Sequence, residues 1–401
     1  MDGLWVDALL LVGGLIVVTV GAEGLIRGAS RIAARFGLGP LLIGLTVVAF
    51  GTSAPEAAIG VFAAWAGEPE IAIGNVVGSN IFNILFILGL TAIITPLTVA
   101  QNLVRTEVPV MIFTSALTWG MAWDGRIETY EGVILLAGAV GYIVFAVLRG
   151  RRESQAVRNE YAAEYGNAPP RTPQKNDSAA AETPNTARTA SGDTAASNAA
   201  GRPARWWIEA LTVVGGIVLL AGGARLLVAG ATGLAKAAGL SDLIIGLTIV
   251  AVGTSIPEVA TSIVAALRNE RDIAVGNAVG SCLLNLLFVL GLSVVAAPSG
   301  VPVAAQAIRF DLPVMLATSV ACLPVFFSGF RIHRWEGGLF FGYYVAYIVY
   351  LVLDATGNGA AAPLRWAMLT FLLPLTAVTL CVITFQAVRK HRSAERPHPA
   401  T

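Results

Sequence analysis

Long hydrophobic stretches, nearly free of charged residues, alternate with short polar segments along most of this 401-residue chain. The hydrocarbon core of a bilayer is about 30 Å thick, and a helix of about 20 apolar residues crosses it. The pattern therefore predicts an all-α polytopic membrane protein. We expect eleven membrane-spanning helices, at about 4–26, 38–66, 71–95, 108–123, 132–148, 207–229, 240–267, 272–297, 312–328, 337–353 and 364–388.

One polar stretch is much longer than the others. Residues 149–205 are rich in Ala, Ser, Thr, Asn, Pro and Arg and contain few large apolar side chains. Such a composition cannot bury enough apolar surface to offset chain entropy, so we predict a disordered linker. The predicted regions are a first membrane repeat (1–148), the linker (149–205), a second membrane repeat (206–353), and an extra helix with a basic tail (354–401).

Internal repetition links the two membrane regions. When the chain is shifted by 202 residues, 43–90 aligns with 245–292, and 28 of the 48 aligned positions are identical. Two shorter matches extend the repeat, pairing 105–111 with 309–315 and 126–132 with 331–337. The repeat unit is then five helices, an odd number, so the second copy enters the membrane inverted. We expect a ten-helix core of two inverted-topology repeats plus one extra C-terminal transmembrane helix.

The placement of Arg and Lys predicts the orientation, because cytoplasmic loops carry an excess of both. Basic residues follow the first, fifth, ninth and eleventh helices, at Arg27, Arg31, Arg35, Arg149, Arg151, Arg152, Arg331, Arg334, Arg389, Lys390 and Arg392. All of them fall on one side of the membrane if the N-terminus is outside. We expect a multi-pass protein of the cell membrane whose linker and C-terminus are cytoplasmic.

A glutamate at the same place in each copy is the strongest functional signal. The segment LIGLTVVAFGTSAPE at 42–56 recurs as IIGLTIVAVGTSIPE at 244–258, so Glu56 aligns with Glu258. A carboxylate at the bilayer centre costs about 2.5–3.5 kcal/mol on insertion scales, which makes an intramembrane Glu a functional candidate. Two of them at matching places indicate one cation site shared by the two halves of a transporter.

The proline before each glutamate adds further oxygens. Pro55 and Pro257 lack an N–H and interrupt their helices. The carbonyls that lose helical partners belong to Gly51, Thr52, Gly253 and Thr254. Unpaired backbone in a membrane is tolerated where it lines a cavity or is buried in protein. Carboxylate, carbonyl and hydroxyl oxygens are hard ligands, which suit Ca²⁺ or Na⁺ and suit Zn²⁺ or Cu⁺ poorly.

A polar stripe follows each glutamate. Its members are four residues apart and share one helix face: Asn75, Ser79 and Asn83 in the first copy, and Asn277, Ser281 and Asn285 in the second. A ridge of glycines lies beside each stripe, at Gly74, Gly78, Gly276 and Gly280. Small residues with this spacing let membrane helices approach closely, which would bring the stripe to the neighbouring glutamate.

Taken singly, each feature has a structural explanation. A membrane proline usually only kinks a helix, a GxxxG pair usually packs, and Asn or Ser stripes usually bond between helices. A buried Glu can also be a protonated hydrogen-bond donor. Their joint recurrence at a fixed offset favours function. Other charges keep structural interpretations: Glu23 and Arg27 form an i,i+4 pair, and Glu107 and Asp311 are typical of helix N-terminal caps.

The cysteines, the histidines and the absence of catalytic motifs argue against several other classes of protein. The three cysteines, Cys282, Cys322 and Cys381, lie in apolar runs and fit buried small side chains, not a disulfide framework or a metal cluster. The three histidines lie outside the apolar runs, and the chain has no HExxH or GxSxG, so we expect no enzyme and no cofactor. Beyond the lipid bilayer and transported ions, we expect no nucleic acid and no obligate protein partner.

At GTSAPE and GTSIPE, each followed by GNxxGS and a further Asn, the chain resembles the calcium/cation antiporter superfamily, in its prokaryotic sodium/calcium exchanger branch. The resemblance covers nearly everything outside the linker and the last helix. It implies that Glu56 and Glu258 bind both Ca²⁺ and Na⁺. It also implies that the carbonyls of Thr52 and Thr254 help to hold Ca²⁺. The remaining ligands that the resemblance implies are Ser53, Ser79, Ser255 and Ser281 for Na⁺, with Asn83 and Asn285 lining the centre.

Two positions depart from the family pattern. Some members have Asp where this chain has Asn285, and potassium-dependent relatives tie that Asp to K⁺, so Asn285 indicates that K⁺ is not required. Cys282 replaces the Asn that usually follows GS, whereas the first copy keeps Asn80. That position lies off the polar stripe, so we expect a packing change.

These observations predict a secondary-active antiporter that exchanges Na⁺ for Ca²⁺ by alternating access. The alternative is a Ca²⁺/H⁺ or other cation/H⁺ exchanger, in which the same two carboxylates carry protons. A passive channel is disfavoured because the polar stripe is short and no helix is polar along its length.

Overall fold

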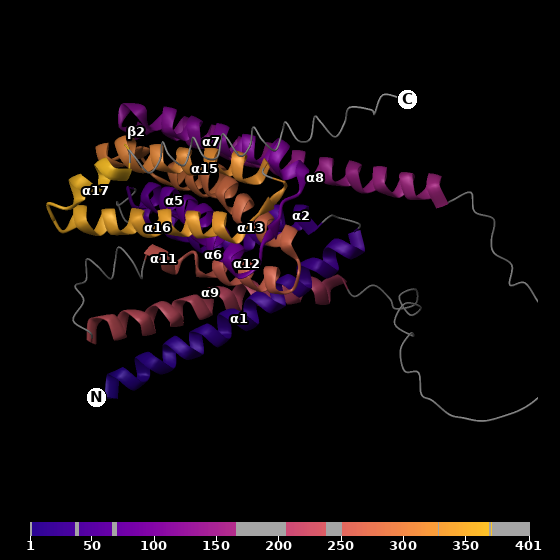
Figure 1. The fold of residues 1–401 in the computed structure, drawn as a ribbon, viewed down its shortest axis with the longest axis horizontal. Helices are drawn as coiled ribbons and strands as arrows, with labels where there is room; N and C mark the ends of the chain where they lie inside the picture. The colour runs from indigo at the N-terminus through magenta and orange to yellow at the C-terminus, as the bar shows by residue number, and fades with distance from the viewer. Residues whose placement is uncertain are drawn as a thin grey trace, which may run out of the picture.

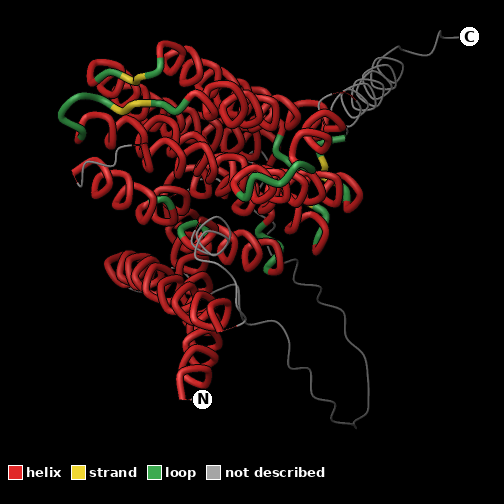
Figure 2. The backbone as a smooth tube through the Cα atoms, turned by 90° about the vertical axis from the view of Figure 1, so that its left-hand side faces the viewer, coloured by secondary structure: helices red, strands yellow, loops and turns green. Residues whose placement is uncertain are grey.

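The protein is described here from a computed structural model, which describes residues 2–36, 40–65, 70–165, 206–237, 251–327, 329–368 and 370. Helices dominate the described residues, which also contain four two-residue strands (Figures 1 and 2). The first half contains α1 (Asp2–Phe36), α2 (Pro40–Ile43), η1 (Gly44–Val48), α3 (Ala49–Thr52), α4 (Ala54–Trp65), α5 (Glu70–Ile81), η2 (Phe82–Leu88), α6 (Gly89–Ile94), β1 (Leu97–Thr98), η3 (Leu103–Glu107), α7 (Val108–Met121), η4 (Ala122–Asp124), β2 (Arg126–Ile127) and α8 (Thr129–Tyr165). The second half contains α9 (Trp206–Ala237), α11 (Ala251–Gly253), α12 (Ile256–Leu267), α13 (Arg271–Leu284), η6 (Asn285–Val289), α14 (Leu290–Ala296), β3 (Val301–Pro302), η7 (Ala307–Asp311), α15 (Leu312–Phe327), β4 (Arg331–Ile332), α16 (Arg334–Ala355) and α17 (Ala361–Ala367).

The hydrophobic runs fall on these helices, which confirms an all-α polytopic membrane protein. Within the described residues, seven helices are long and apolar enough to cross a membrane, or eight if the bent pair α2–α3 and α4 forms one span. The run at 108–123 coincides with α7, which is only 14 residues long. The eleventh run, 364–388, begins in α17 and otherwise lies outside the described residues, as does much of 240–267.

Two spans form the centre of the molecule. In Ile71–Ile94 and Arg271–Ala296, 72% and 83% of the most apolar stretch is buried, against 28–39% in the other five spans. Glycines on α13 let the first half approach its backbone. A Cβ built at Gly280 would lie 2.8 Å from the Cα of Leu45, and one at Gly276 would lie 3.0 Å from the Leu41 carbonyl oxygen. The predicted close approach is therefore present on α13.

The matching glycine ridge on α5 has no such neighbour within the part of the chain that the structure describes. No described heavy atom lies within 4 Å of a Cβ built at Gly74 or Gly78. The segment that aligns with 41–45 is 243–247, and it lies outside the described residues.

Helices α1 and α9 lie side by side along one edge of the molecule, below the other helices in Figures 1 and 2. Glycines seven residues apart face the partner helix on both sides of this contact. They are Gly14, Gly21 and Gly28 on α1 and their aligned residues Gly216, Gly223 and Gly230 on α9. A Cβ built at Gly216 would lie 2.6 Å from the Leu25 backbone nitrogen, and one at Gly21 would lie 2.7 Å from that of Leu220. Only glycine permits backbones to pack this closely.

The short strands connect the two halves. Strand β1 pairs antiparallel with β4, joining Leu97 to Ile332, and β2 pairs antiparallel with β3, joining Ile127 to Val301. Each half therefore pairs its strands with those of the other half and not with its own.

Two details differ from the sequence-based expectations. Helix α8 continues to Tyr165, so the first 17 residues of the predicted linker (149–165) are helical; 166–205 lie outside the described residues. The interpretation of Glu107 and Asp311 as helix caps is wrong. Helical residues already run from Gln101 through Glu107 and from Ala305 through Asp311, so neither acidic residue begins a helix. The Glu107 side chain makes no capping bond, and Asp311 accepts a hydrogen bond from Tyr347 Oη at 3.0 Å.

Candidate functional site

Each half contains a helix break just before its proline. Helix α3 ends at Thr52, Ser53 forms a turn, and α4 begins at Ala54, with a bend of 42° between the two parts. In the second half, α11 ends at Gly253 and α12 begins at Ile256. Pro55 and Pro257 lie in the first turn of the new helix, where a missing N–H leaves no helical bond unmade. The predicted helix breaks are confirmed.

The breaks place the two glutamates in the first turn of α4 and α12, where both are completely buried. Their hydrogen bonds are exchanged between the halves. Ser53 Oγ donates to Glu258 Oε1 at 3.4 Å, and the aligned Ser255 Oγ donates to Glu56 Oε1 at 3.2 Å. Each carboxylate is therefore bound by the turn of the opposite half, and the two break regions form one polar centre.

The polar stripes of α5 and α13 contact the same centre. Ser255 Oγ lies 3.3 Å from Ser79 Oγ, and Thr52 Oγ1 lies 3.5 Å from Ser281 Oγ. The threonines also reach the first residue of each opposite stripe, because Thr52 Oγ1 donates to Asn277 Oδ1 at 3.2 Å and Thr254 Oγ1 to Asn75 Oδ1 at 3.5 Å.

Asn83 and Asn285 lie one turn further along their helices, both at 0% exposure. Each falls in a π-helical segment, η2 or η6, that interrupts an otherwise α-helical span. π-Helical turns recur at functional sites. The hydrophobic pattern carries no signal for these segments, and the sequence did not predict them.

Several polar atoms at this centre lack a hydrogen-bond partner within the described part of the chain. They are Oε2 of Glu56 and of Glu258 and both amide atoms of Asn83 and of Asn285. Leaving a buried polar atom unpaired costs about 1–3 kcal/mol, so native proteins rarely do so without a reason. The free acceptors are carboxylate and amide oxygens, the ligand chemistry of Ca²⁺ and Na⁺. All ten predicted site residues thus lie on the helix breaks and on the two central helices.

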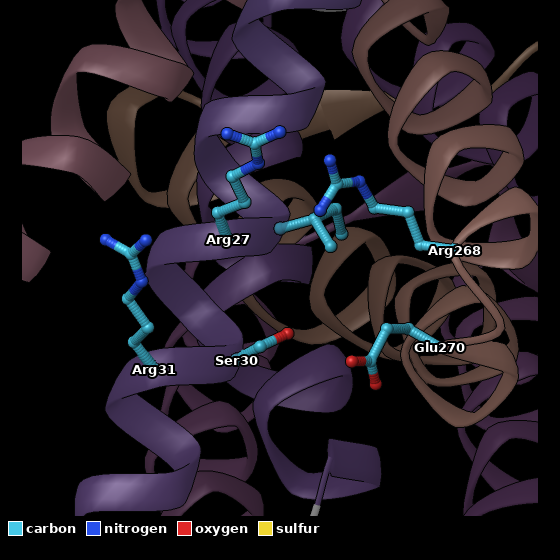
Figure 3. Close-up of a pocket in the computed structure, with 6 residues that line it drawn as sticks. Arg27, Ser30, Arg31, Arg268 and Glu270 are labelled. Atoms are coloured by element: carbon cyan, nitrogen blue, oxygen red, sulfur yellow. The ribbon is translucent and has the colours of Figure 1, made fainter. Parts of the chain in front are cut away.

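A second polar group lies between α1 and the end of α12, away from the glutamates. It surrounds a cavity of about 310 Å³ lined by Ile26, Arg27, Ser30, Arg31, Arg268 and Glu270 (Figure 3). The predicted ion pair between Glu23 and Arg27 is present at 2.5 Å. Glu23 also binds Arg268, whose Nε lies 2.6 Å from Glu23 Oε2. This contact ties α1 to the end of the helix that carries Glu258.

Comparison with known proteins gives consistent results over most of the chain. The family model described as sodium/calcium exchanger protein matches residues 6–148 and 208–353. The putative antiporter CaxA of Alkalimonas amylolytica is 35% identical over 320 residues, 79% of this chain and 89% of its own. The sodium/calcium exchanger MaX1 of Methanosarcina acetivorans is 30% identical over 369 residues, 86% of this chain and 98% of its own.

A solved structure of the sodium-calcium exchanger NCX_Mj has the same fold. It superposes with a TM-score of 0.67 at 27% sequence identity, covering 87% of this chain and 99% of that one. A shorter match, to the Ca(2+)/H(+) antiporter ChaA of Bacillus subtilis, is 28% identical over 145 residues, 35% of this chain and 40% of that relative.

Proposed function

Because the chain belongs to the sodium/calcium exchanger family, we propose that it carries Ca²⁺ and Na⁺ in opposite directions through the Glu56–Glu258 centre. The observation that supports this most is the pair of buried carboxylates, each bonded to a serine of the opposite half and each with one oxygen that has no partner among the described residues. The names of MaX1 and NCX_Mj, which include both ions, support the same choice of substrates.

The two carboxylates supply about two negative charges, so one Ca²⁺ or a set of Na⁺ ions can neutralise them, but not both together. The ions then compete for one site, which is what exchange requires. An empty site leaves two buried charges without compensation, which is strongly unfavourable. The protein therefore changes access mainly when loaded, and transport in one direction is coupled to transport in the other.

The surrounding oxygens have separate roles in this proposal. The backbone carbonyls of Thr52 and Thr254 complete the Ca²⁺ ligands beside the glutamates. Four hydroxyls contribute to Na⁺ binding, those of Ser53, Ser79, Ser255 and Ser281. Asn83 and Asn285 line the centre with uncharged amide oxygens. Because Asn285 stands where potassium-dependent relatives have Asp, K⁺ is not required.

The decisive test is Ca²⁺ uptake into Na⁺-loaded proteoliposomes, with the variants Glu56→Gln and Glu258→Gln. Each change removes one of the two charges and leaves the shape intact, so uptake is expected to fall to background in both. Glu131→Gln is the matched control. Glu131 Oε2 accepts the backbone N–H of Glu128 at the start of α8, and an amide oxygen can keep that bond. Uptake that survives in either site variant overturns the proposed site.

A second candidate function is Ca²⁺/H⁺ exchange, which the partial match to ChaA favours. In that case protons replace Na⁺ as the ions that neutralise the two glutamates. The same vesicles separate the two functions. Uptake that needs internal Na⁺ and persists without K⁺ or a pH gradient supports Na⁺/Ca²⁺ exchange, whereas uptake driven by a pH gradient in Na⁺-free vesicles supports the proton-coupled function.

A further inference from the structure

We propose that Asn277 is a positioning residue that holds the two halves of the cation site at a fixed separation. The proposal rests on the proposed function of that site and assigns a role to a side chain outside its expected ligands. Asn277 lies on α13, one helical turn before Ser281, and is completely buried.

Both ends of the Asn277 amide are bound to protein. Its Oδ1 accepts a hydrogen bond from Thr52 Oγ1 at 3.2 Å. Its Nδ2 lies 3.4 Å from the Glu258 backbone oxygen and 3.0 Å from Ser262 Oγ, and donates to both. Thr52 belongs to the helix break of the first half, and Glu258 and Ser262 belong to α12 of the second. One side chain thus ties the break to the helix that carries the opposite glutamate.

These contacts distinguish Asn277 from the two asparagines at the centre. The amide atoms of Asn83 and Asn285 have no hydrogen-bond partner within the described part of the chain, so their oxygens are available to a cation. The amide of Asn277 is already hydrogen-bonded to Thr52 and Glu258, so it affects ion binding by holding those two residues in place.

The aligned residue, Asn75, gives an internal comparison. Its Oδ1 accepts from Thr254 Oγ1 at 3.5 Å, but its Nδ2 has no partner among the residues that the structure describes. The sequence explains one of the two bonds that Asn75 Nδ2 lacks, because Ser262 aligns with Gly60 and the first half has no hydroxyl there. A side chain at position 60 would collide with Ser293 Oγ. Within the described residues, the Asn277 amide is therefore bound through both its oxygen and its nitrogen, and the Asn75 amide only through its oxygen.

The test measures the half-saturating concentrations of Ca²⁺ and Na⁺ for exchange by Asn277→Ala in proteoliposomes. Without the amide, the Thr52 turn is free to shift relative to Glu258, so both concentrations are expected to rise about tenfold, the scale of losing a buried hydrogen-bond partner. Asn277→Asp is expected to show the same rise, because it places an acceptor against the Glu258 carbonyl. Asn75→Ala is expected to have a smaller effect.

Asn80→Cys is the matched control. Asn80 is also a buried asparagine on a central helix, but its amide binds Val76 O of its own helix at 2.9 Å. Cysteine already stands at the aligned position, Cys282, so this fold accepts it there. Both half-saturating concentrations are expected to stay unchanged in this variant.

A double-mutant cycle separates positioning from packing. Thr52→Val keeps the backbone carbonyl but removes the hydroxyl that binds Asn277, so it alone is expected to reproduce the Asn277→Ala effect. Adding Asn277→Ala to it should then change little, because both variants remove the same contact. Fully additive effects, or a lower maximal rate with unchanged half-saturating concentrations in Asn277→Ala, would overturn the inference.

Ion-dependent thermal unfolding of the purified protein tests the inference apart from transport. A wild-type protein without Na⁺-dependent Ca²⁺ uptake overturns the proposed function. The inference is then decided by the Ca²⁺ or Na⁺ concentration that raises the unfolding temperature. A tenfold higher concentration for Asn277→Ala supports it; the same concentration, or no ion effect on the wild type, overturns it.

Discussion

Glu56 and Glu258 each accept a hydrogen bond from a serine of the opposite half of the chain, so neither half contains both members of either pair. Glu56 depends on Ser255 and Glu258 on Ser53, with each serine Oγ within 3.4 Å of the carboxylate that it binds. Ser255 also contacts Ser79, which connects the first-half carboxylate to the first-half stripe through a second-half residue.

Removal of the bridging hydroxyl should affect the two ions unequally. In the proposed site, Ca²⁺ would be held mainly by the two carboxylates, whereas a hydroxyl would be a larger share of the attraction for singly charged Na⁺. Ser255→Ala is therefore expected to raise the half-saturating Na⁺ concentration about tenfold and the Ca²⁺ value less, measured as Na⁺-dependent Ca²⁺ uptake.

Ser293→Ala serves as its control, because Ser293 is a buried serine whose Oγ binds Val289 O of its own helix at 2.8 Å. Equal rises for both ions in Ser255→Ala would contradict a role in Na⁺ binding.

At the residue scale, the sequence predicted which side chains are polar and buried, but it did not predict their hydrogen-bond partners. A charge beside proline in an apolar run predicted a helix break, and the structure has one before Glu56 and one before Glu258, with both side chains buried. The sequence has no local signal that Ser53 binds Glu258, because that contact depends on how two distant helices cross. The same holds for Asn277, which the stripe pattern grouped with Asn285 although its contacts differ.

Among the elements, α1 and α9 stand out because their contact is built from glycines seven residues apart on both helices. A seven-residue spacing keeps the glycines on one face over several turns. Backbone atoms approach closely along this face, and dispersion forces act over the whole contact.

Two adjacent glycines on α9 allow a direct test of this contact. A side chain at Gly216 would meet Leu25 and Gly21, whereas one at Gly215 would meet no described heavy atom within 4 Å. Gly216→Leu is expected to lower stability by about 1–3 kcal/mol through overpacking. Gly215→Leu should be neutral or slightly stabilising, since leucine favours helix over glycine.

Thermal unfolding in detergent, followed by loss of the monodisperse protein peak, compares the two variants. Equal unfolding temperatures for Gly215→Leu and Gly216→Leu would mean that the close approach contributes little.

Element positions were predictable from hydrophobicity, and their ends and irregular turns were not. The run at 132–148 located α8, but the helix continues to Tyr165 through polar residues that a hydropathy pattern assigns to a linker. The π-helical segments η2 and η6 widen a helical turn without any characteristic composition, so the hydrophobic pattern gives no signal for them.

At the scale of the whole molecule, contacts between the halves are exchanged between aligned positions. Strand β1 pairs with β4 while β2 pairs with β3, and the serine–glutamate bonds follow the same rule. Such exchange is expected of two halves related by an approximate two-fold axis. Whether that axis lies in the membrane plane depends on the inverted orientation of the second half, which stays a prediction.

Cysteine labelling at aligned exposed positions tests the inversion. Thr129 starts α8 and the aligned Arg334 starts α16, and both are exposed. In a cysteine-free background, Thr129→Cys is expected to react with an impermeant thiol reagent from outside the cell. Arg334→Cys is expected to react only after the inner face is made accessible. Reaction of both from the same side would contradict inverted repeats.

The exchanged contacts also constrain how the protein is made. A ribosome delivers the first half before the second, so β1 and β2, the glycine face of α1 and the Glu56 carboxylate enter the membrane before their partners exist. Completion of the first half therefore waits for synthesis to reach β4 at Ile332. Because the partners are held by contacts and not by continuity of the chain, two fragments divided within 166–205 should find each other when co-expressed, and neither should be stable alone.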